Sequence, residues 1–268
     1  MQKYNDDMKW STPPQEITSA YLKSCRLSVE DDTRFNKFKQ DPNYTTILEG
    51  TSQEMANMFF TAIIKDPVCD AYFLHNLEHL RENDALGSPT LYDCGKYGLF
   101  SSGTLKYIWN CAVISKELDL QDGKSVVEIG GGYGGMCKTL SVFNKFKNYA
   151  LIDLKEPIEL CSKYLRNFDS IYSKLKFYTP KTSADVDLSC DLVIADSSIA
   201  ECNYSMQKFY LENIILKAKK GFIIYNSLHL SEQNRFFFEM YDALIANGYS
   251  VKAKRLYNTG VVEMIFKK

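Results

Sequence analysis

The stretch VVEIGGGYGGMCKTL, residues 126–140, decides the fold of this chain. Its apolar start predicts a buried strand, and Met136, Cys137 and Leu140 recur at the spacing of a buried helix face. Five glycines stand between the two elements, where the backbone must turn tightly and can approach a ligand closely. We therefore expect a strand-to-helix loop that binds a nucleotide-like cofactor. A purely structural turn is the alternative.

The loop satisfies two cofactor-binding patterns. Gly130, Gly132 and Gly135 match G-x-G-x-x-G, which is typical of dinucleotide binding. Glu128 with the glycines at 130, 132 and 134 matches E-x-G-x-G-x-G, which points to S-adenosylmethionine. A pyrophosphate binds at a helix N-terminus and would be repelled by the Glu128 carboxylate, whereas the ammonium and sulfonium of S-adenosylmethionine would be attracted. We favour S-adenosylmethionine as the cofactor.

Downstream of the loop, strands and helices alternate with short links. This alternation predicts a parallel sheet covered by helices on both faces. We expect strands at 148–154, 175–178, 191–196 and 222–226, and helices at 157–168, from about 205 to a stop at Gly221, and at 231–247.

The end of the chain breaks this alternation. Residues 249–257 and 261–266 are two extended runs joined by Asn258, Thr259 and Gly260, which indicate a hairpin turn. Such a hairpin is irregular for dinucleotide-binding folds and resembles the last two strands of the class I methyltransferase fold. The predicted fold class is α/β, a Rossmann-like class I methyltransferase sheet, mostly parallel with a C-terminal antiparallel hairpin, plus an N-terminal helical cap.

The first hundred residues differ in pattern from the rest. They are polar, with helical stretches near 52–64 and 68–81 and little β pattern. We interpret residues 1–100 as a helical cap that forms the substrate region, and residues 101–268 as an S-adenosylmethionine-binding methyltransferase domain. Residues 101–118 predict a helix that packs beside the first strand of that domain.

The composition disfavours several classes of partner. With 268 residues and a net charge of −1, and with basic residues scattered among acidic ones, the chain has no electrostatic footprint for nucleic acid. The longest strongly apolar stretch, residues 58–64, is too short to span a bilayer. Eight cysteines form no C-x-x-C pair, which favours reduced thiols in a reducing compartment. We expect a cytoplasmic protein and leave a homo-oligomer open.

The predicted cofactor site extends beyond the glycines. Asp153 closes the second strand 25 residues after Glu128, where its carboxylate can accept both ribose hydroxyls; a solvated strand-end aspartate is the alternative. Glu128 is expected to act on the methionine end through a water or a neighbouring amide, and Tyr133 either covers the cofactor or faces solvent. The candidate cofactor contacts are Glu128, Gly130, Gly131, Gly132, Tyr133, Gly134, Asp153, Leu154 and Asp196.

Residues at the carboxyl ends of the fourth and fifth strands should flank the reactive methyl, because ligands bind outside the strand ends in such sheets. Asp196, Ser197, Glu201, Asn226 and His229 stand there. A sugar hydroxyl becomes a good nucleophile only as its proton leaves, so a general base is useful. His229 is our first candidate for that base, followed by Asp196 and Glu201. An ordinary surface role for His229 is the alternative.

A second motif competes with this interpretation. His75, Glu78 and His79 spell H-x-x-E-H, the inverted zinc-protease signature, and on one helix the two histidines would share a face and could bind a metal. No downstream acidic ligand stands in a matching helical context, and zinc hydrolysis would leave the glycine loop without a role. We interpret the motif as a solvated helix face and expect no metal site.

Several segments together carry a family resemblance. FNKFKQDPNYTTILEG, ENDALGSP, SGTLKYIW, VVEIGGGYGG, ALIDL, SIAE and FIIYN lie between Phe35 and Asn226. Over this range the chain resembles the sugar O-methyltransferase family found in polysaccharide and glycosylated-metabolite gene clusters. The resemblance implies cofactor binding by Glu128, by the glycines at 130, 132 and 134, and by Asp153. It adds candidates for the sugar pocket, which are Asn83, Asp84, Thr104, Tyr107 and Glu201. Asn226, at the end of its strand, completes the predicted substrate-binding set.

The chain departs from that family at one position. Where the family pattern has arginine before the tyrosine, this chain has Lys106, which weakens the expectation of a bidentate contact there. The combined prediction is an S-adenosylmethionine-dependent O-methyltransferase that acts on a sugar hydroxyl, in a nucleotide sugar or a glycan. The alternatives are a non-catalytic cofactor-binding partner subunit and an NAD-dependent oxidoreductase. The oxidoreductase would fit only if the predicted terminal hairpin did not form.

Overall fold

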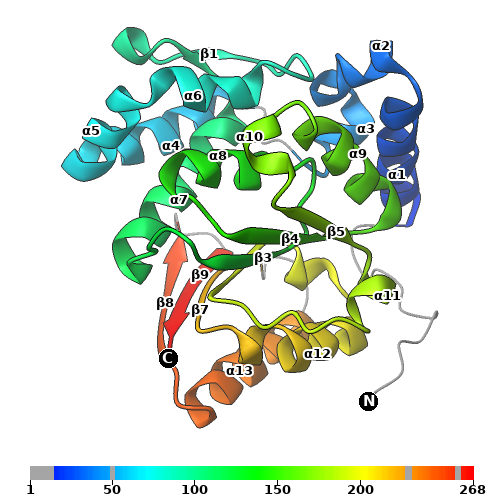
Figure 1. Cartoon of the computed structure of the whole chain (residues 1–268), viewed down its shortest axis with the longest axis vertical. Coiled ribbons are helices and arrows are strands. Elements are labelled where there is room, and N and C mark those ends of the chain that lie inside the picture. Colours follow the sequence, from blue (N-terminus) through cyan, green and yellow to red (C-terminus); the bar gives the residue numbers. More distant parts are fainter. Residues whose placement is uncertain (1–14, 49–51, 227–230, 257–260) are drawn as a thin grey trace.

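The computed structural model describes residues 15–48, 52–226, 231–256 and 261–268, and its centre is a seven-stranded sheet (Figure 1). The order across this sheet is β5-β4-β3-β6-β7-β9-β8. The strands are β3 (Ser125–Ile129), β4 (Asn148–Ile152), β5 (Leu175–Tyr178), β6 (Leu192–Asp196), β7 (Lys220–Asn226), β8 (Ser250–Leu256) and β9 (Val261–Lys267).

The sheet is parallel except at one edge. The β3, β4, β5, β6 and β7 strands pair in parallel, whereas β9 runs antiparallel to both β7 and β8. The β8–β9 pairing ends at Leu256 opposite Val261, as a hairpin requires, although the predicted turn residues 258–260 lie outside the described residues. This arrangement confirms the predicted fold class, a Rossmann-like methyltransferase sheet with a C-terminal antiparallel hairpin.

Helices cover both faces of the sheet, which explains why its central strands are apolar on both sides. The helices on one face are α7 (Ser102–Leu118), α8 (Gly135–Phe143) and α9 (Lys155–Leu165), and on the other α12 (Tyr204–Asn213) and α13 (Ser231–Ala246) (Figure 1). Val126 and Val127 are neighbours in β3, yet they belong to separate core clusters because alternate strand residues point to opposite faces. The short helices α10 (Asp169–Tyr172) and α11 (Pro180–Ser183) flank β5.

The N-terminal region is helical, as predicted, and lies beyond α7, α8 and α9 on the same side of the sheet (Figure 1). Its elements are α1 (Gln15–Glu30), α2 (Asp32–Phe35), α3 (Pro42–Thr45), α4 (Gln53–Lys65), α5 (Pro67–His75) and α6 (Leu77–Arg81), followed by a small hairpin of β1 (Tyr92–Asp93) and β2 (Leu99–Phe100). Tyr21 and Phe38 of this cap share one core cluster with Val126 and Ile194 of the sheet. The division at residue 100 stays a prediction.

Two predicted elements were wrong in detail. The single helix predicted over 68–81 is two helices, because Asn76 leaves the helical conformation with φ −116° and ψ 17°. Gly221 does not stop a helix but lies inside β7, where a side chain would collide with the Phe266 ring 2.0 Å from the position of its Cβ. The preceding helix α12 already ends at Asn213.

Candidate active site at the carboxyl edge of the sheet

The glycine loop turns between β3 and α8 in close contact with its neighbours. Gly130 has φ +79°, and a Cβ there would lie 2.1 Å from the Cβ of Ser198. Gly134 caps α8 with φ +91°, and a Cβ there would lie 2.7 Å from Cδ1 of Leu165. Both positions therefore require glycine, for backbone conformation and for space. They hold the loop against the end of β6 and against α9.

A cavity of about 220 Å³ opens beside this loop, at the carboxyl ends of β3, β4, β6 and β7. This is the edge at which open α/β sheets bind their ligands. Leu48 and Asn226, which line the cavity, each directly precede a segment that the structure does not describe. The lining residues are Tyr21, Ile47, Leu48, Gly103, Lys106, Tyr107, Gly130, Gly132, Asp153, Asp196, Ser197, Ser198, Glu201 and Asn226.

Asp153 lies where the sequence predicted, directly after β4 and on the cavity wall. Its Oδ2 accepts a hydrogen bond of 2.8 Å from the Gly132 amide, and its Oδ1 accepts one of 2.7 Å from the Leu154 amide. Burial raises the pKa of this carboxyl to about 6, while the two amides act in the opposite direction. A carboxylate has about four acceptor sites, so two amides leave it capacity for ligand hydroxyls.

Glu128 lies in the buried interior, and its expected action on the methionine end through a water or a neighbouring amide stays a prediction. It is only 2% exposed, does not line the cavity, and accepts a hydrogen bond of 2.7 Å from the Tyr149 hydroxyl. Burial raises the pKa of this carboxyl to about 8, with smaller raising effects from Asp196 and Asp153. Near neutral pH Glu128 is therefore largely uncharged, and its side chain lies beside Tyr149 on the face of the sheet that α7, α8 and α9 cover.

Asp196 forms a charged pair at the end of β6. Its Oδ2 lies 2.8 Å from the Nζ of Lys106 and accepts a hydrogen bond of 3.1 Å from Nδ2 of Asn110. Both partners come from α7, so this helix positions the carboxylate at the cavity. Lys106 thus forms an ion pair with a carboxylate of its own chain.

The backbone next to Asp196 is strained. Ser197 has φ +65°, an uncommon conformation for a residue with a side chain, and its amide donates a hydrogen bond of 2.8 Å to the Ile224 carbonyl. Such conformations persist where the surrounding structure holds them, often at functional sites. Here the turn directs the chain from β6 into the short 3₁₀ segment Ile199–Glu201.

Glu201 lines the cavity and is a second carboxyl with a changed proton affinity. Burial raises the pKa of Glu201 to about 8, and the nearby Asp153 and Asp196 carboxylates act in the same direction. The charge of Lys106 acts in the opposite direction and lowers this pKa. A carboxyl with a pKa near the working pH, facing a cavity, has the properties of a general acid or base.

The structure brings only part of the predicted substrate set to the cavity. Tyr107 and Asn226 line it. Asn83 and Thr104 are buried and bonded to each other, Asn83 Nδ2 donating to Thr104 Oγ1 at 2.7 Å. Asp84 accepts hydrogen bonds from the amide and hydroxyl of Ser101, at the start of α7. Asn83, Asp84 and Thr104 do not line this cavity, and their hydrogen bonds join the cap to α7; their role in a sugar pocket stays a prediction.

The predicted cofactor set divides in the same way. Gly130, Gly132, Asp153 and Asp196 line the cavity, whereas Glu128, Gly131, Tyr133, Gly134 and Leu154 are not in its wall. Tyr133 neither covers the cavity nor faces solvent, because its side chain is fully buried and its hydroxyl accepts a hydrogen bond of 3.1 Å from Asn83. Leu154 contributes its amide to Asp153.

The two histidines that the structure describes, His75 and His79, do not line this cavity. His229, our first candidate for the base, lies outside the described residues. His75 and His79 are separated by the helix break at Asn76, and Nδ1 of His79 lies 3.2 Å from Glu82. Among the residues that the structure describes, no group of three or more histidine, cysteine, aspartate or glutamate side chains could hold a metal ion.

Several lining residues were missed by sequence reasoning. Tyr21, Ile47 and Leu48 come from the cap, which was expected to bind the acceptor rather than to border the glycine loop. Leu48 lies so close that a Cβ on Gly132 would be 2.9 Å from it. No local pattern marks these residues, because their place depends on how the cap packs. Gly103 and Ser198 were missed as well.

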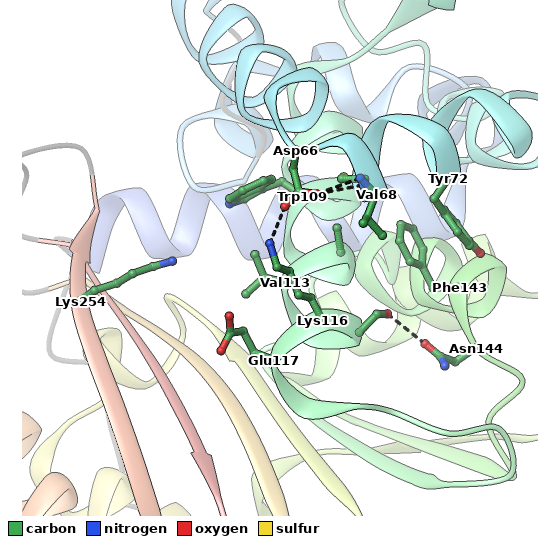
Figure 2. A pocket seen from close by; sticks show the side chains of 13 residues that line it. Asp66, Val68, Tyr72, Trp109, Val113, Lys116, Glu117, Phe143, Asn144 and Lys254 are labelled. Carbon is green, nitrogen blue, oxygen red and sulfur yellow. Dashed lines mark hydrogen bonds and ion pairs between the residues drawn. The ribbon is translucent and has the colours of Figure 1, made fainter.

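A larger cavity, of about 350 Å³, lies elsewhere (Figure 2). Figure 2 shows Asp66 and Lys116 paired across it, 2.7 Å apart, with Trp109, Tyr72 and Phe143 around an apolar interior. It contains no residue of the glycine loop and none from the carboxyl ends of the strands. The smaller cavity is therefore the candidate active site.

Comparisons with known proteins match the fold and not the sequence. No protein-family model matches the chain, and no curated protein matches it. A precorrin-6y C5,15-methyltransferase from Geobacter metallireducens is 16% identical over 59% of this chain and 88% of its own, with a TM-score of 0.43. A ribosomal protein L11 methylase from Lactobacillus delbrueckii is 14% identical over 61% of this chain and 79% of its own, with a TM-score of 0.43.

A third solved structure covers more of the chain. The pyocyanin biosynthetic protein PhzM is 15% identical over 82% of this chain and 73% of its own, with a TM-score of 0.46. Similarity at this level carries no information on the reaction. The strand order and the glycine loop define the class of fold, that of the Rossmann-like methyltransferases. None of the described helices is long and apolar enough to cross a membrane.

Proposed function

We propose that this chain is an S-adenosylmethionine-dependent O-methyltransferase that acts on a sugar hydroxyl, in a nucleotide sugar or a glycan. The observation that carries the proposal is that Asp153, the tight turn at Gly130 and the half-buried carboxyl of Glu201 line one cavity. A cofactor-binding carboxylate and a candidate base thereby stand within one site of a methyltransferase fold.

The residues present fit this cofactor. The Asp153 carboxylate keeps acceptor capacity for the two ribose hydroxyls, and Gly130 and Gly132 leave room for the close approach of a ligand to the backbone. Ile47 and Leu48 offer apolar surface to a purine ring. When bound, S-adenosylmethionine supplies a methyl group on a sulfonium. Glu128, which does not line the cavity, is proposed to act on the methionine end through a water or a neighbouring amide.

In the reaction, we assign the role of general base to Glu201, which would accept the proton of the acceptor hydroxyl. Its raised pKa matches that role, since a base works best with a pKa near the operating pH. The Lys106–Asp196 pair positions the end of β6 beside it, and Tyr107 and Asn226 are the proposed contacts to the sugar. His229 stays a candidate base from the sequence alone.

The sugar acceptor rests on the resemblance of residues 35–226 to the sugar O-methyltransferase family. The ring of Tyr107 and the amide of Asn226 suit a sugar, which offers an apolar face and many hydroxyls. Eight buried free thiols support a reducing compartment, and we place the enzyme in the cytoplasm. The net charge of −1 speaks against nucleic acid as the acceptor.

Two other functions compete with this proposal. A non-catalytic cofactor-binding subunit would have no need for a cavity-lining Glu201 whose pKa is raised to about 8. An NAD-dependent oxidoreductase is disfavoured by the β8–β9 hairpin.

Calorimetric titration with S-adenosylmethionine, its demethylated product and NAD in parallel tests the cofactor, and the expected result is binding of the first two and not of NAD. Transfer of a labelled methyl group to a panel of nucleotide sugars and glycan fragments tests the reaction. Binding of NAD alone would overturn the proposed function.

A further inference from the structure

A lysine is buried in the aromatic interior behind the glycine loop. Lys39 lies in the short 3₁₀ segment Phe38–Gln40 of the cap and is only 1% exposed. Its Nζ donates a hydrogen bond of 2.7 Å to the Asn83 carbonyl. The same atom lies 4.2 Å from the ring centroid of Tyr133 and 5.3 Å from that of Tyr164, distances at which a cation is attracted by an aromatic face.

Asn83 extends this cluster to two further elements. Its Nδ2 donates to the Tyr133 hydroxyl at 3.1 Å, and its Oδ1 accepts a hydrogen bond of 2.7 Å from the Tyr164 hydroxyl. Tyr164 belongs to α9, and the rings of Tyr133 and Tyr164 meet edge to face, 4.9 Å apart. Tyr133 is thus held from the cap and from α9 at once.

Tyr133 is a residue of the glycine loop itself. It stands between Gly132, whose amide donates to Asp153 at the cavity wall, and Gly134, which caps α8. Gly132 and Gly134 are joined directly to Tyr133, so a shift of the Tyr133 backbone would move both of them. The position of the Gly132 amide therefore depends on what holds Tyr133.

We propose that Lys39 and Asn83 are positioning residues for the cofactor-binding loop: the cap sets the affinity for the cofactor through Tyr133, without touching the ligand. This inference rests on the proposed function, from which it takes S-adenosylmethionine as the ligand. It gives the cap a role in cofactor binding in addition to the expected role in binding the acceptor.

The physical argument comes from the cost of burying a lysine. Removing an ammonium from water is expensive, so a buried lysine is retained only where its contacts offset that cost; at Lys39 these contacts include the Asn83 carbonyl and the rings of Tyr133 and Tyr164. When Lys39 is replaced, the Asn83 carbonyl keeps a second donor, the Tyr164 hydroxyl at 3.0 Å. If Lys39 serves to hold Tyr133, its replacement by methionine should spare the fold and loosen the loop.

The test compares Lys39→Met with Lys37→Met, an exposed lysine at the start of the same segment whose side chain makes no capping bond. For Lys39→Met we expect an unfolding midpoint close to that of the wild type and a Kd for S-adenosylmethionine about five- to twentyfold weaker, with kcat at saturating cofactor within about twofold. Lys37→Met should match the wild type throughout. An unchanged Kd in Lys39→Met would overturn the inference.

Hydrogen exchange on the unliganded protein gives a readout that needs no cofactor. We expect Lys39→Met to speed exchange in residues 130–135 and to leave exchange in β6 unchanged. If the loop exchanges equally fast in variant and wild type, the inference is overturned, whether or not the wild type binds S-adenosylmethionine. A wild type that does not bind S-adenosylmethionine would overturn the proposed function separately. Should Lys39→Met fail to fold, Tyr133→Phe removes only the hydroxyl that Asn83 contacts. That variant should weaken the Kd severalfold, and an unchanged Kd counts against the inference.

Discussion

The Nζ of Lys106 in α7 lies 2.8 Å from Oδ2 of Asp196 at the end of β6, and this pair stands beside Glu201 on the wall of the same cavity. The charge of Lys106 lowers the pKa of Glu201, while Asp196 and Asp153 raise it. Burial is the largest cause of the raised Glu201 pKa, and these charges modify it, so that the pKa can be altered one residue at a time.

The methyl-transfer rate should rise as the pH passes through the Glu201 pKa. Because that pKa lies near 8 and a base acts only when deprotonated, kcat/KM in the free enzyme should increase up to about pH 8 and then level off. In the complex the positive sulfonium should lower this pKa, so the kcat profile should turn at a lower pH. Initial rates from pH 6 to 9.5 measure both profiles.

Glu201→Gln should remove this rise and lower kcat by about 10²- to 10⁴-fold, the usual contribution of a general base. His229→Ala is the informative comparison, because the sequence favoured His229. Retained turnover in Glu201→Gln, together with its loss in His229→Ala, would move the base to His229. Cofactor titration of both variants checks that the site still forms.

Lys106→Met should shift the activity profile of the free enzyme to higher pH. The positive charge of Lys106 lowers the Glu201 pKa, so this pKa should rise when the charge is removed. The Asp196 carboxylate keeps Asn110 as its partner from α7. The measurement is the midpoint of the kcat/KM profile. Lys116→Met is the matched control, since it breaks the Lys116–Asp66 pair far from the glycine loop. A profile that does not move in Lys106→Met would contradict the proposed role of Glu201.

The sheet and the glycine loop could be predicted from the sequence because their signals are local. The turn at Gly130 needs a glycine for backbone conformation, and the short apolar runs and the hairpin residues define strands without reference to distant parts of the chain. Asp153 follows from its place after β4. These features depend on a few neighbouring residues.

The cap could not be predicted in the same way. Asn83 and Asp84 look like solvated or ligand-binding residues in sequence, and only the packing of the cap shows that Asn83 is buried against Thr104. Lys39 is the strongest case, because a lysine in a polar stretch gives no sign that it will be enclosed by aromatic rings. Long-range contacts decide these positions.

Asp153→Asn should weaken cofactor binding about tenfold or more, since a ribose hydroxyl would lose a charged acceptor. Affinity in the wild type should fall as the pH drops through about 6, where this carboxyl takes up a proton, and the variant should lose that dependence. Calorimetric titration between pH 5 and 8 measures both effects. Asp185→Asn, at an exposed position, serves as the control. A variant with wild-type affinity would remove Asp153 from the cofactor site.

Glu128→Gln should stabilise the protein, and increasingly so as the pH rises. The folded-state pKa of Glu128, about 8, lies above its ordinary value of 4.5, so between these limits the folded state holds a proton that the unfolded chain has released. The free energy of unfolding of the wild type therefore falls with rising pH across this window. Glutamine avoids that loss and can still accept the hydrogen bond from Tyr149.

The measurement is the unfolding midpoint of variant and wild type at pH 5, 6.5 and 8, without cofactor. Asp153 and Glu201 also titrate with raised pKa values, but they are common to both proteins, so the difference isolates Glu128. The gap in favour of Glu128→Gln should widen from pH 5 to pH 8, whereas Glu159→Gln, on the exposed side of α9, should follow the wild type. A constant or shrinking gap would mean that Glu128 is ionised in the folded state, which would restore it as a charged group beneath the glycine loop.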